Sequence, residues 1–62
     1  MCLSTVIEKN GAANEALMNN VSRIAFHDGE IELEDIMGRR LSFKGDILDV
    51  DFIQNTVVVC KQ

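Results

Sequence analysis

The sequence is poor in residues that small proteins often use to stabilise a fold or to bind nucleic acid. Its 62 residues include no proline, tryptophan or tyrosine, only three phenylalanines, two cysteines and one histidine. The longest apolar run, residues 57–60, is far shorter than the roughly 20 residues that a membrane-spanning helix needs. Because even the longest apolar run is this short, we expect no insertion into a membrane. We expect a cytoplasmic protein without a signal peptide, because no basic stretch precedes an apolar core at the N-terminus.

Positive charge is also scarce in this chain. Six lysines and arginines face ten aspartates and glutamates, which gives a formal net charge of −4. A phosphate backbone repels an acidic domain, and three phenylalanines offer little surface for stacking bases, so we expect no nucleic-acid partner. The two cysteines, Cys2 and Cys60, are not expected to form a structural disulfide in a reducing cytoplasm.

The length limits what the chain can do alone. A domain of about 60 residues buries only about 60% of the surface that its unfolded chain exposes, so a partner subunit would help to stabilise it. A chain of this length also leaves little room for a cleft of roughly 300 Å³ or more, the size typical of small-molecule sites. Both points favour an oligomeric binding module over a monomeric enzyme.

The first third of the chain predicts one strand clearly and leaves the next segment open. Residues 2–8 are rich in β-branched side chains, which are typical of strands. Asn10 and Gly11 form a turn signal of the Asn-Gly kind. Residues 12–20 are compatible either with one helical turn or with a short strand followed by a loop.

The middle of the chain predicts a β-hairpin. Residues 21–27 and 30–34 both alternate between two kinds of side chain, and Asp28-Gly29 joins them as a tight turn. In the second of these segments the three glutamates face solvent and the two apolar residues face the core. This hairpin is the clearest local pattern in the sequence.

The remaining segments complete an all-β pattern. They are a turn at Gly38, strands at residues 41–43, 45–53 and 56–60, and a turn at residues 54–55. Five or six short strands in one domain, residues 1–62, predict a small SH3-like antiparallel barrel, or an OB-like roll, because closing a sheet removes its edges. The last strand is apolar on both faces. We therefore expect it to be buried on both sides, within the barrel or against a second subunit.

Cys2 is the most informative candidate for chemistry. The α-amine of Met1, the backbone nitrogen of Cys2 and its thiolate can close two five-membered chelate rings around one metal ion. The backbone nitrogen of Leu3, or a second subunit, can supply a fourth donor. Four such nitrogen and sulfur donors in a plane suit Ni(II) or Cu(II). The alternative interpretation is that Cys2 only begins the first strand as a small apolar residue.

The other reactive side chains predict no active site. Cys60 ends an apolar strand and is expected to be a core thiol, with a disulfide or a second metal ligand as alternatives. His27 is expected to be an exposed residue beside a turn. The alternating acids are expected to form a solvated strand face: Glu30, Glu32 and Glu34. Since no catalytic constellation is present, we expect that the protein is not an enzyme.

Several segments together resemble the CooT family of small nickel-binding proteins. They are Met1-Cys2 and residues 21–24 (VSRI), 30–38 (EIELEDIMG), 47–52 (ILDVDF) and 56–59 (TVVV). The resemblance implies a homodimeric SH3-like barrel that binds one Ni(II) per dimer and assists nickel insertion into carbon monoxide dehydrogenase. It also implies that Cys2 is the nickel cysteine, with the amine of Met1 and nearby backbone nitrogens as further ligands.

There are two alternatives, of which the first is another metallochaperone and the second belongs to a different class. A HypC-like hydrogenase maturation chaperone also begins with Met-Cys, but such proteins usually continue with a proline, which this chain lacks. A small barrel can also bind peptides or nucleic acid. A peptide groove would need exposed aromatic side chains, whereas the three phenylalanines are expected in the core.

Overall fold

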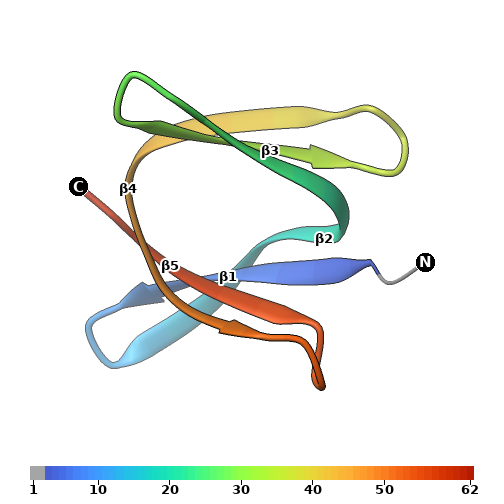
Figure 1. Ribbon diagram of the computed structural model, residues 1–62. Helices are drawn as coiled ribbons and strands as arrows, with labels where there is room; N and C mark the ends of the chain where they lie inside the picture. Colours follow the sequence, from blue (N-terminus) through green and yellow to red (C-terminus); the bar gives the residue numbers. More distant parts are fainter. Residues whose placement is uncertain (1–2) are drawn as a thin grey trace.

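Two long, bent strands connect the two layers of the fold. The computed structural model describes residues 3–62. Its strands are β1 (Ser4–Asn10), β2 (Ala13–His27), β3 (Glu30–Asp35), β4 (Arg40–Asp51) and β5 (Thr56–Lys61). Figure 1 shows the second half of β2 with β3 and the first half of β4 in one layer, and β1 and β5 with the other halves of β2 and β4 in the second. No helix that could span a membrane occurs within the described residues.

The five strands close into a ring in sequence order, and β5 pairs with β1. The four pairings between consecutive strands are antiparallel, whereas β1 and β5 are parallel. This exception follows from the odd number of strands. Each hairpin reverses the chain, so β5 runs in the same direction as β1 after four reversals. The prediction of an all-β, SH3-like small barrel is confirmed.

Residues 12–20, which the sequence left ambiguous, belong almost entirely to β2. The strand pairs with β1 from Ala13 to Val21 and with β3 from Val21 to His27. It bends where it changes partner, and Asn20 there has a φ of 56°, a left-handed conformation that asparagine tolerates well. The first half of β2 is largely exposed. It therefore lacks the alternation of apolar and polar residues by which a half-buried strand is recognised.

The two strands predicted at residues 41–43 and 45–53 are one continuous strand, β4, which ends at Asp51. Gly45 does not interrupt it. A Cβ atom at this position would overlap the carbonyl group of Cys60, so glycine allows β4 to pass close to β5. The register shifts between Ile47 and Asp49, which is typical of a β-bulge in a strongly bent strand.

The predicted hairpin is confirmed and supplies the centre of the core. Asp28 and Gly29 both have positive φ values, 49° and 80°, as a two-residue turn of the Asp-Gly kind requires. Ile31 and Leu33 are buried, as expected. The buried hydrophobic side chains are Val6, Val21, Ile31, Leu33, Val57 and Val59.

The last strand is fully buried on one face only. Val57 and Val59 lie in the core, whereas Val58 and Cys60 point to the other side and are half-buried. The expectation for the phenylalanines is wrong in two of three positions, because Phe26 is 66% exposed and Phe52 is 85% exposed. Phe26 is paired with the buried Ile31, but the opposite layer does not cover it.

Candidate functional site

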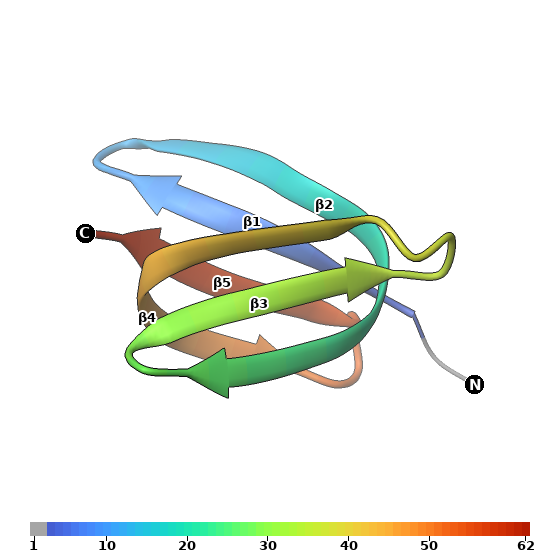
Figure 2. The same ribbon diagram turned by 90° about the horizontal axis from the view of Figure 1, so that it is seen from above.

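The start of β1, the bend of β2 and the end of β3 meet at one end of the barrel. Ser4 pairs with Val21, and Val21 pairs with Asp35. Figure 2 shows the β3–β4 and β4–β5 turns at the same end as the start of β1. Of the predicted metal ligands, Met1 and Cys2 lie outside the described residues, and Leu3 is half-buried just before β1. We call the end of the barrel where β1 starts, β2 bends and β3 ends the β1-start end.

Asp35 organises the turn between β3 and β4. Its Oδ1 accepts hydrogen bonds from the backbone N–H groups of Met37 and Arg39, both at 2.9 Å. Its Oδ2 accepts a hydrogen bond from Nε of Arg39 at 2.8 Å. The carboxylate is therefore satisfied by three donors although Asp35 is only 4% exposed.

These donors determine the charge state of Asp35. Burial of the carboxyl group by itself raises its pKa. The backbone N–H and the guanidinium of Arg39, together with the N–H of Met37, outweigh burial and hold the pKa below its ordinary value of 3.8. Asp35 is consequently a buried anion at neutral pH, held by its own turn.

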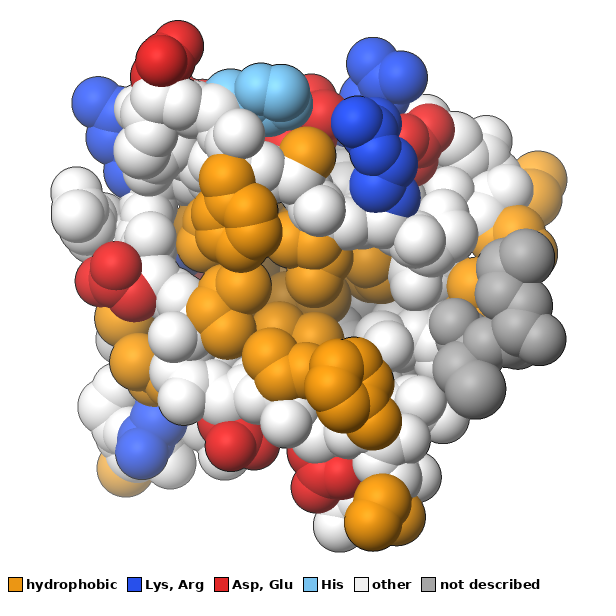
Figure 3. All heavy atoms as spheres, viewed as in Figure 1, with side chains coloured by type: hydrophobic (Ala, Val, Ile, Leu, Met, Phe, Trp, Pro, Cys, Tyr) orange, Lys and Arg blue, Asp and Glu red, His pale blue; other side chains and the backbone are white. Residues whose placement is uncertain are grey.

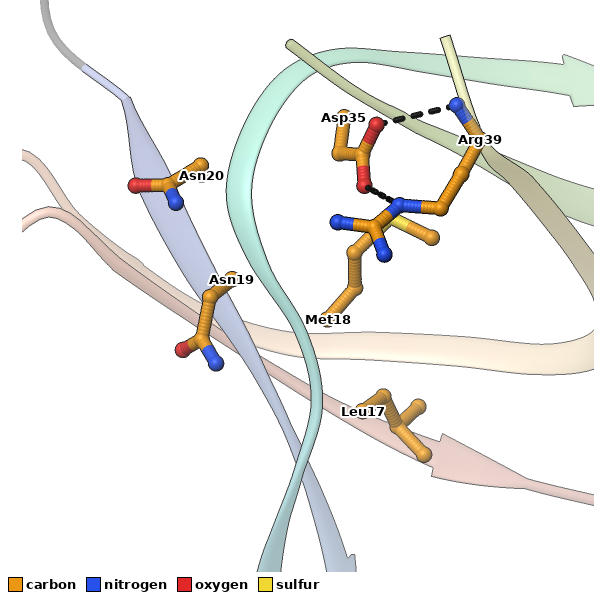
Figure 4. Close-up of a pocket in the computed structure, with 6 residues that line it drawn as sticks. All are labelled: Leu17, Met18, Asn19, Asn20, Asp35 and Arg39. Carbon is orange, nitrogen blue, oxygen red and sulfur yellow. Dashed lines mark hydrogen bonds and ion pairs between the residues drawn. The ribbon is translucent and has the colours of Figure 1, made fainter. Parts of the chain in front are cut away.

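A shallow hollow of about 410 Å³ lies between this turn and the bend of β2. Figure 4 shows the guanidinium of Arg39 next to the Asp35 carboxylate, with Asn19 and Asn20 on the other side of the hollow. Leu17 and Met18 complete its lining. The carbonyl oxygen of Asn20 also accepts the N–H of Ile36 at 3.0 Å, which ties the turn to the bend.

The β4–β5 turn at the same end is built in a similar way. Oδ1 of Asp51 accepts the backbone N–H groups of Ile53 and Gln54, both at 2.9 Å. The N–H of Thr5 then donates to the carbonyl oxygen of Asn55 at 2.9 Å, which attaches the turn to β1. Both turns present exposed apolar side chains: Ile36, Met37, Phe52 and Ile53.

The histidine and the glutamates lie apart from the β1-start end or are engaged in ion pairs. His27 is exposed at the β2–β3 turn, and its Nε2 is 3.9 Å from Oε1 of Glu32. Arg23 and Arg40 flank Glu34, at 3.5 and 3.8 Å. The expected solvated acidic face is thus half-buried and partly neutralised by basic residues on the neighbouring strands.

Cys60 is a free, half-buried thiol on β5. Among residues 3–62, no group of three or more histidine, cysteine, aspartate or glutamate residues has the geometry to hold a metal ion. The sequence did not identify Asp35 as a buried residue. The only signal was its position three residues before Gly38, a spacing typical of a tight turn.

Comparison with known proteins decides the family. The model of the family described as "CO dehydrogenase accessory protein CooT" matches residues 1–60. The chain belongs to the CooT family. The match includes Cys2 and almost the whole barrel, and it agrees with the resemblance seen in the sequence.

A solved CooT structure has the same fold. A putative CooT from Carboxydothermus hydrogenoformans superposes with a TM-score of 0.92 over 98% of each chain, at 20% sequence identity. The CooT barrel is thus retained where four of every five residues differ. No curated protein matches the chain.

Proposed function

We propose that this CooT-family chain is a nickel-binding accessory protein. It carries Ni(II) as cargo at its N-terminal Met-Cys and assists nickel insertion into carbon monoxide dehydrogenase. The observation that carries this proposal is the family match over residues 1–60, which includes Cys2. The role is to hold the ion and transfer it to a client enzyme, so no bond of a substrate is made or broken.

The donor set proposed for the ion suits this role chemically. Met1 provides an amine nitrogen, and Cys2 provides a backbone nitrogen and a thiolate in adjacent chelate rings. The backbone nitrogen of Leu3 is a further donor within the same short segment. Nitrogen and sulfur donors of this kind favour Ni(II) and Cu(II) over calcium or magnesium, which prefer oxygen ligands.

The proposal includes a homodimer in the cytoplasm. A 62-residue chain that buries six hydrophobic side chains within residues 3–62 has a small core, and association would remove further apolar surface from water. A dimer would also allow two chains to contribute donors to one ion, which would complete a coordination shell that a single Met-Cys segment leaves open.

The thiolate is tested by comparing two cysteine substitutions. Cys2→Ser is expected to abolish nickel binding in calorimetry and to remove the thiolate-to-nickel band in the ultraviolet spectrum. Cys60→Ser is the matched control, because it removes the other thiol, on β5. It is expected to leave both signals intact. Unchanged nickel affinity in Cys2→Ser would overturn the assignment.

The amine is tested by adding glycine and serine before Met1. This extension keeps the Cys2 thiol but replaces the amine with an amide, so we expect nickel affinity to fall. Because binding displaces protons from the amine and the thiol, the affinity of the unmodified chain is expected to rise with pH. Equal affinity of the extended and the unmodified chain would exclude the amine as a ligand.

A further inference from the structure

One face of the barrel is bordered by two strand edges that have no partner within residues 3–62. The second half of β2 pairs only with β3, and the second half of β4 pairs only with β5. Figures 1 and 2 show both half-strands at the front of the molecule, and in Figure 1 one lies in the upper layer and the other in the lower layer. Their outer edges carry backbone N–H and C=O groups that can pair with another strand. We call this face the front opening.

The side chains within the front opening are apolar and exposed. Phe26 pairs with Ile31, and Val50 pairs with Val57. Directly paired residues point to the same side of a sheet, and both partners are buried. Phe26 and Val50 therefore face the interior, yet they are 66% and 44% exposed. Figure 3 shows hydrophobic side chains gathered in the middle of this face.

The two edges of the front opening differ in charge. The β2 edge carries Arg23 and His27, which are exposed but lie 3.5 and 3.9 Å from glutamates of β3, and β2 has no acidic residue between them. The β4 edge carries three acidic residues, Asp46, Asp49 and Asp51. Two β2 edges, or two β4 edges, would repel each other, whereas a β2 edge and a β4 edge would attract each other.

We propose that a second copy of this chain covers the front opening, with the β2 edge of each protomer paired to the β4 edge of its partner. The two half-strands run in opposite directions along the opening (Figure 1). A two-fold axis parallel to these half-strands leaves the direction of each strand unchanged. It places the β4 edge of the second protomer opposite the β2 edge of the first. Each β2 edge then meets a β4 edge in antiparallel orientation, and each basic edge meets an acidic one.

Such an interface would cover a large share of the chain's surface. A stable protein–protein interface buries about 800 Å² of each partner, which is roughly a fifth of the 4380 Å² that this chain exposes. Closing the opening also removes both strand edges from solvent and places Phe26 and Val50 in a shared core. A single contact thus removes the apolar surface and the unpaired backbone groups together.

This inference rests on the homodimer of the proposed function and names its surface. β1 starts at one end of the front opening, and an axis along the opening places the starts of both β1 strands at the same end of the dimer. The interface itself does not depend on nickel.

A charge exchange between two variants tests the pairing of unlike edges. The variant Arg23→Glu/His27→Glu makes the β2 edge acidic, and the variant Asp46→Lys/Asp49→Lys makes the β4 edge basic. Each variant alone is expected to be monomeric, because both contacts of its dimer become repulsive. Mixed in equal amounts they are expected to form a heterodimer, because both contacts then join unlike charges.

The apolar centre is tested by a matched pair of substitutions. Phe26→Ser is expected to weaken dimerisation by roughly 30-fold or more, as loss of a central aromatic contact does. Met37→Ser removes an exposed apolar side chain from the β3–β4 turn, outside the front opening, and is expected to leave the dissociation constant unchanged. Analytical ultracentrifugation gives both values, and circular dichroism confirms that the variants fold.

Hydrogen exchange tests the same interface without a substitution. Amides of residues 22–27 and 46–51 that point away from β3 and β5 are expected to become protected as the chain concentration rises. A wild-type chain that stays monomeric up to about 1 mM, where even weak association would be visible, overturns both the homodimer and this interface. A dimer without edge protection, or without rescue in the mixture, overturns the interface alone. Loss of nickel binding with an intact dimer overturns only the nickel assignment.

Discussion

Asp35 shows how one short carboxylate can replace the missing partners of a turn. Backbone N–H groups at the end of a strand need acceptors when they are not exposed to water. The two oxygens of Asp35 accept two backbone N–H groups and the Nε of Arg39, while its own N–H donates to the carbonyl oxygen of Arg39 at 3.0 Å. The turn is thereby fixed at the β1-start end.

Asp35→Asn is expected to lower stability at neutral pH, because an amide cannot accept three hydrogen bonds as a carboxylate does. The pKa of Asp35 is lower in the folded chain than its ordinary value, so the folded state favours the anion. This contribution is fully present above the unfolded pKa and is lost as pH falls through the folded pKa. Urea unfolding at decreasing pH measures the loss.

Glu34→Gln is the control for Asp35→Asn, since Glu34 is less buried and its ion pairs are longer. We expect wild type and Asp35→Asn to differ most at neutral pH and to converge in acid, whereas Glu34→Gln stays close to wild type throughout. A constant difference between Asp35→Asn and wild type at every pH would contradict the role given to the charge.

The sequence predicted some residues and not others for a physical reason. Ile31 and Leu33 alternate with glutamates, so the pattern itself assigns them to the core. Asp35 continues the acidic alternation but is buried, because its partners are backbone groups of a turn that no side-chain pattern reveals. Phe26 has an apolar side chain of the kind expected in a core, and its exposure depends on where the opposite layer ends.

At the scale of elements, β2 and β4 determine the barrel because each belongs to both layers. The sequence divided both at their bends. Asn20 in β2 and Gly45 in β4 look like interruptions when a strand is expected to be straight, whereas both lie within continuous strands. The hairpin of β2 and β3 could be predicted because its two strands are regular where they pair.

Gly45→Ala is expected to destabilise the fold by about 2 kcal/mol or more, in the range of overpacked sites. The added Cβ would overlap the backbone carbonyl of Cys60, and a backbone group in a ladder cannot rotate away as a side chain can. Ser42→Ala, at an exposed position of the same strand, is the control and is expected to stay within about 0.5 kcal/mol of wild type. Thermal unfolding measures both.

At the scale of the whole molecule, the small core and the exposed apolar face have the same cause, because the barrel buries only part of its hydrophobic side chains. The chain is 47% hydrophobic, but six hydrophobic side chains are buried among the described residues. The composition indicated that the chain folds and gains from a partner. It could not indicate which surface a partner would cover, because the proposed surface is formed by the edges of two strands distant in sequence.

Stability is therefore expected to depend on concentration. If folding and dimerisation are coupled, a tenfold increase in chain concentration stabilises the dimer by about 1.4 kcal/mol. For two chains of this length that corresponds to a rise of about 5 °C in Tm. Calorimetry over a hundredfold range of concentration measures the slope. The Tm of the Arg23→Glu/His27→Glu variant should not depend on concentration, because its acidic β2 edge repels the acidic β4 edge of a second copy. The same slope in the variant and the wild type would mean that the dimer forms through another surface.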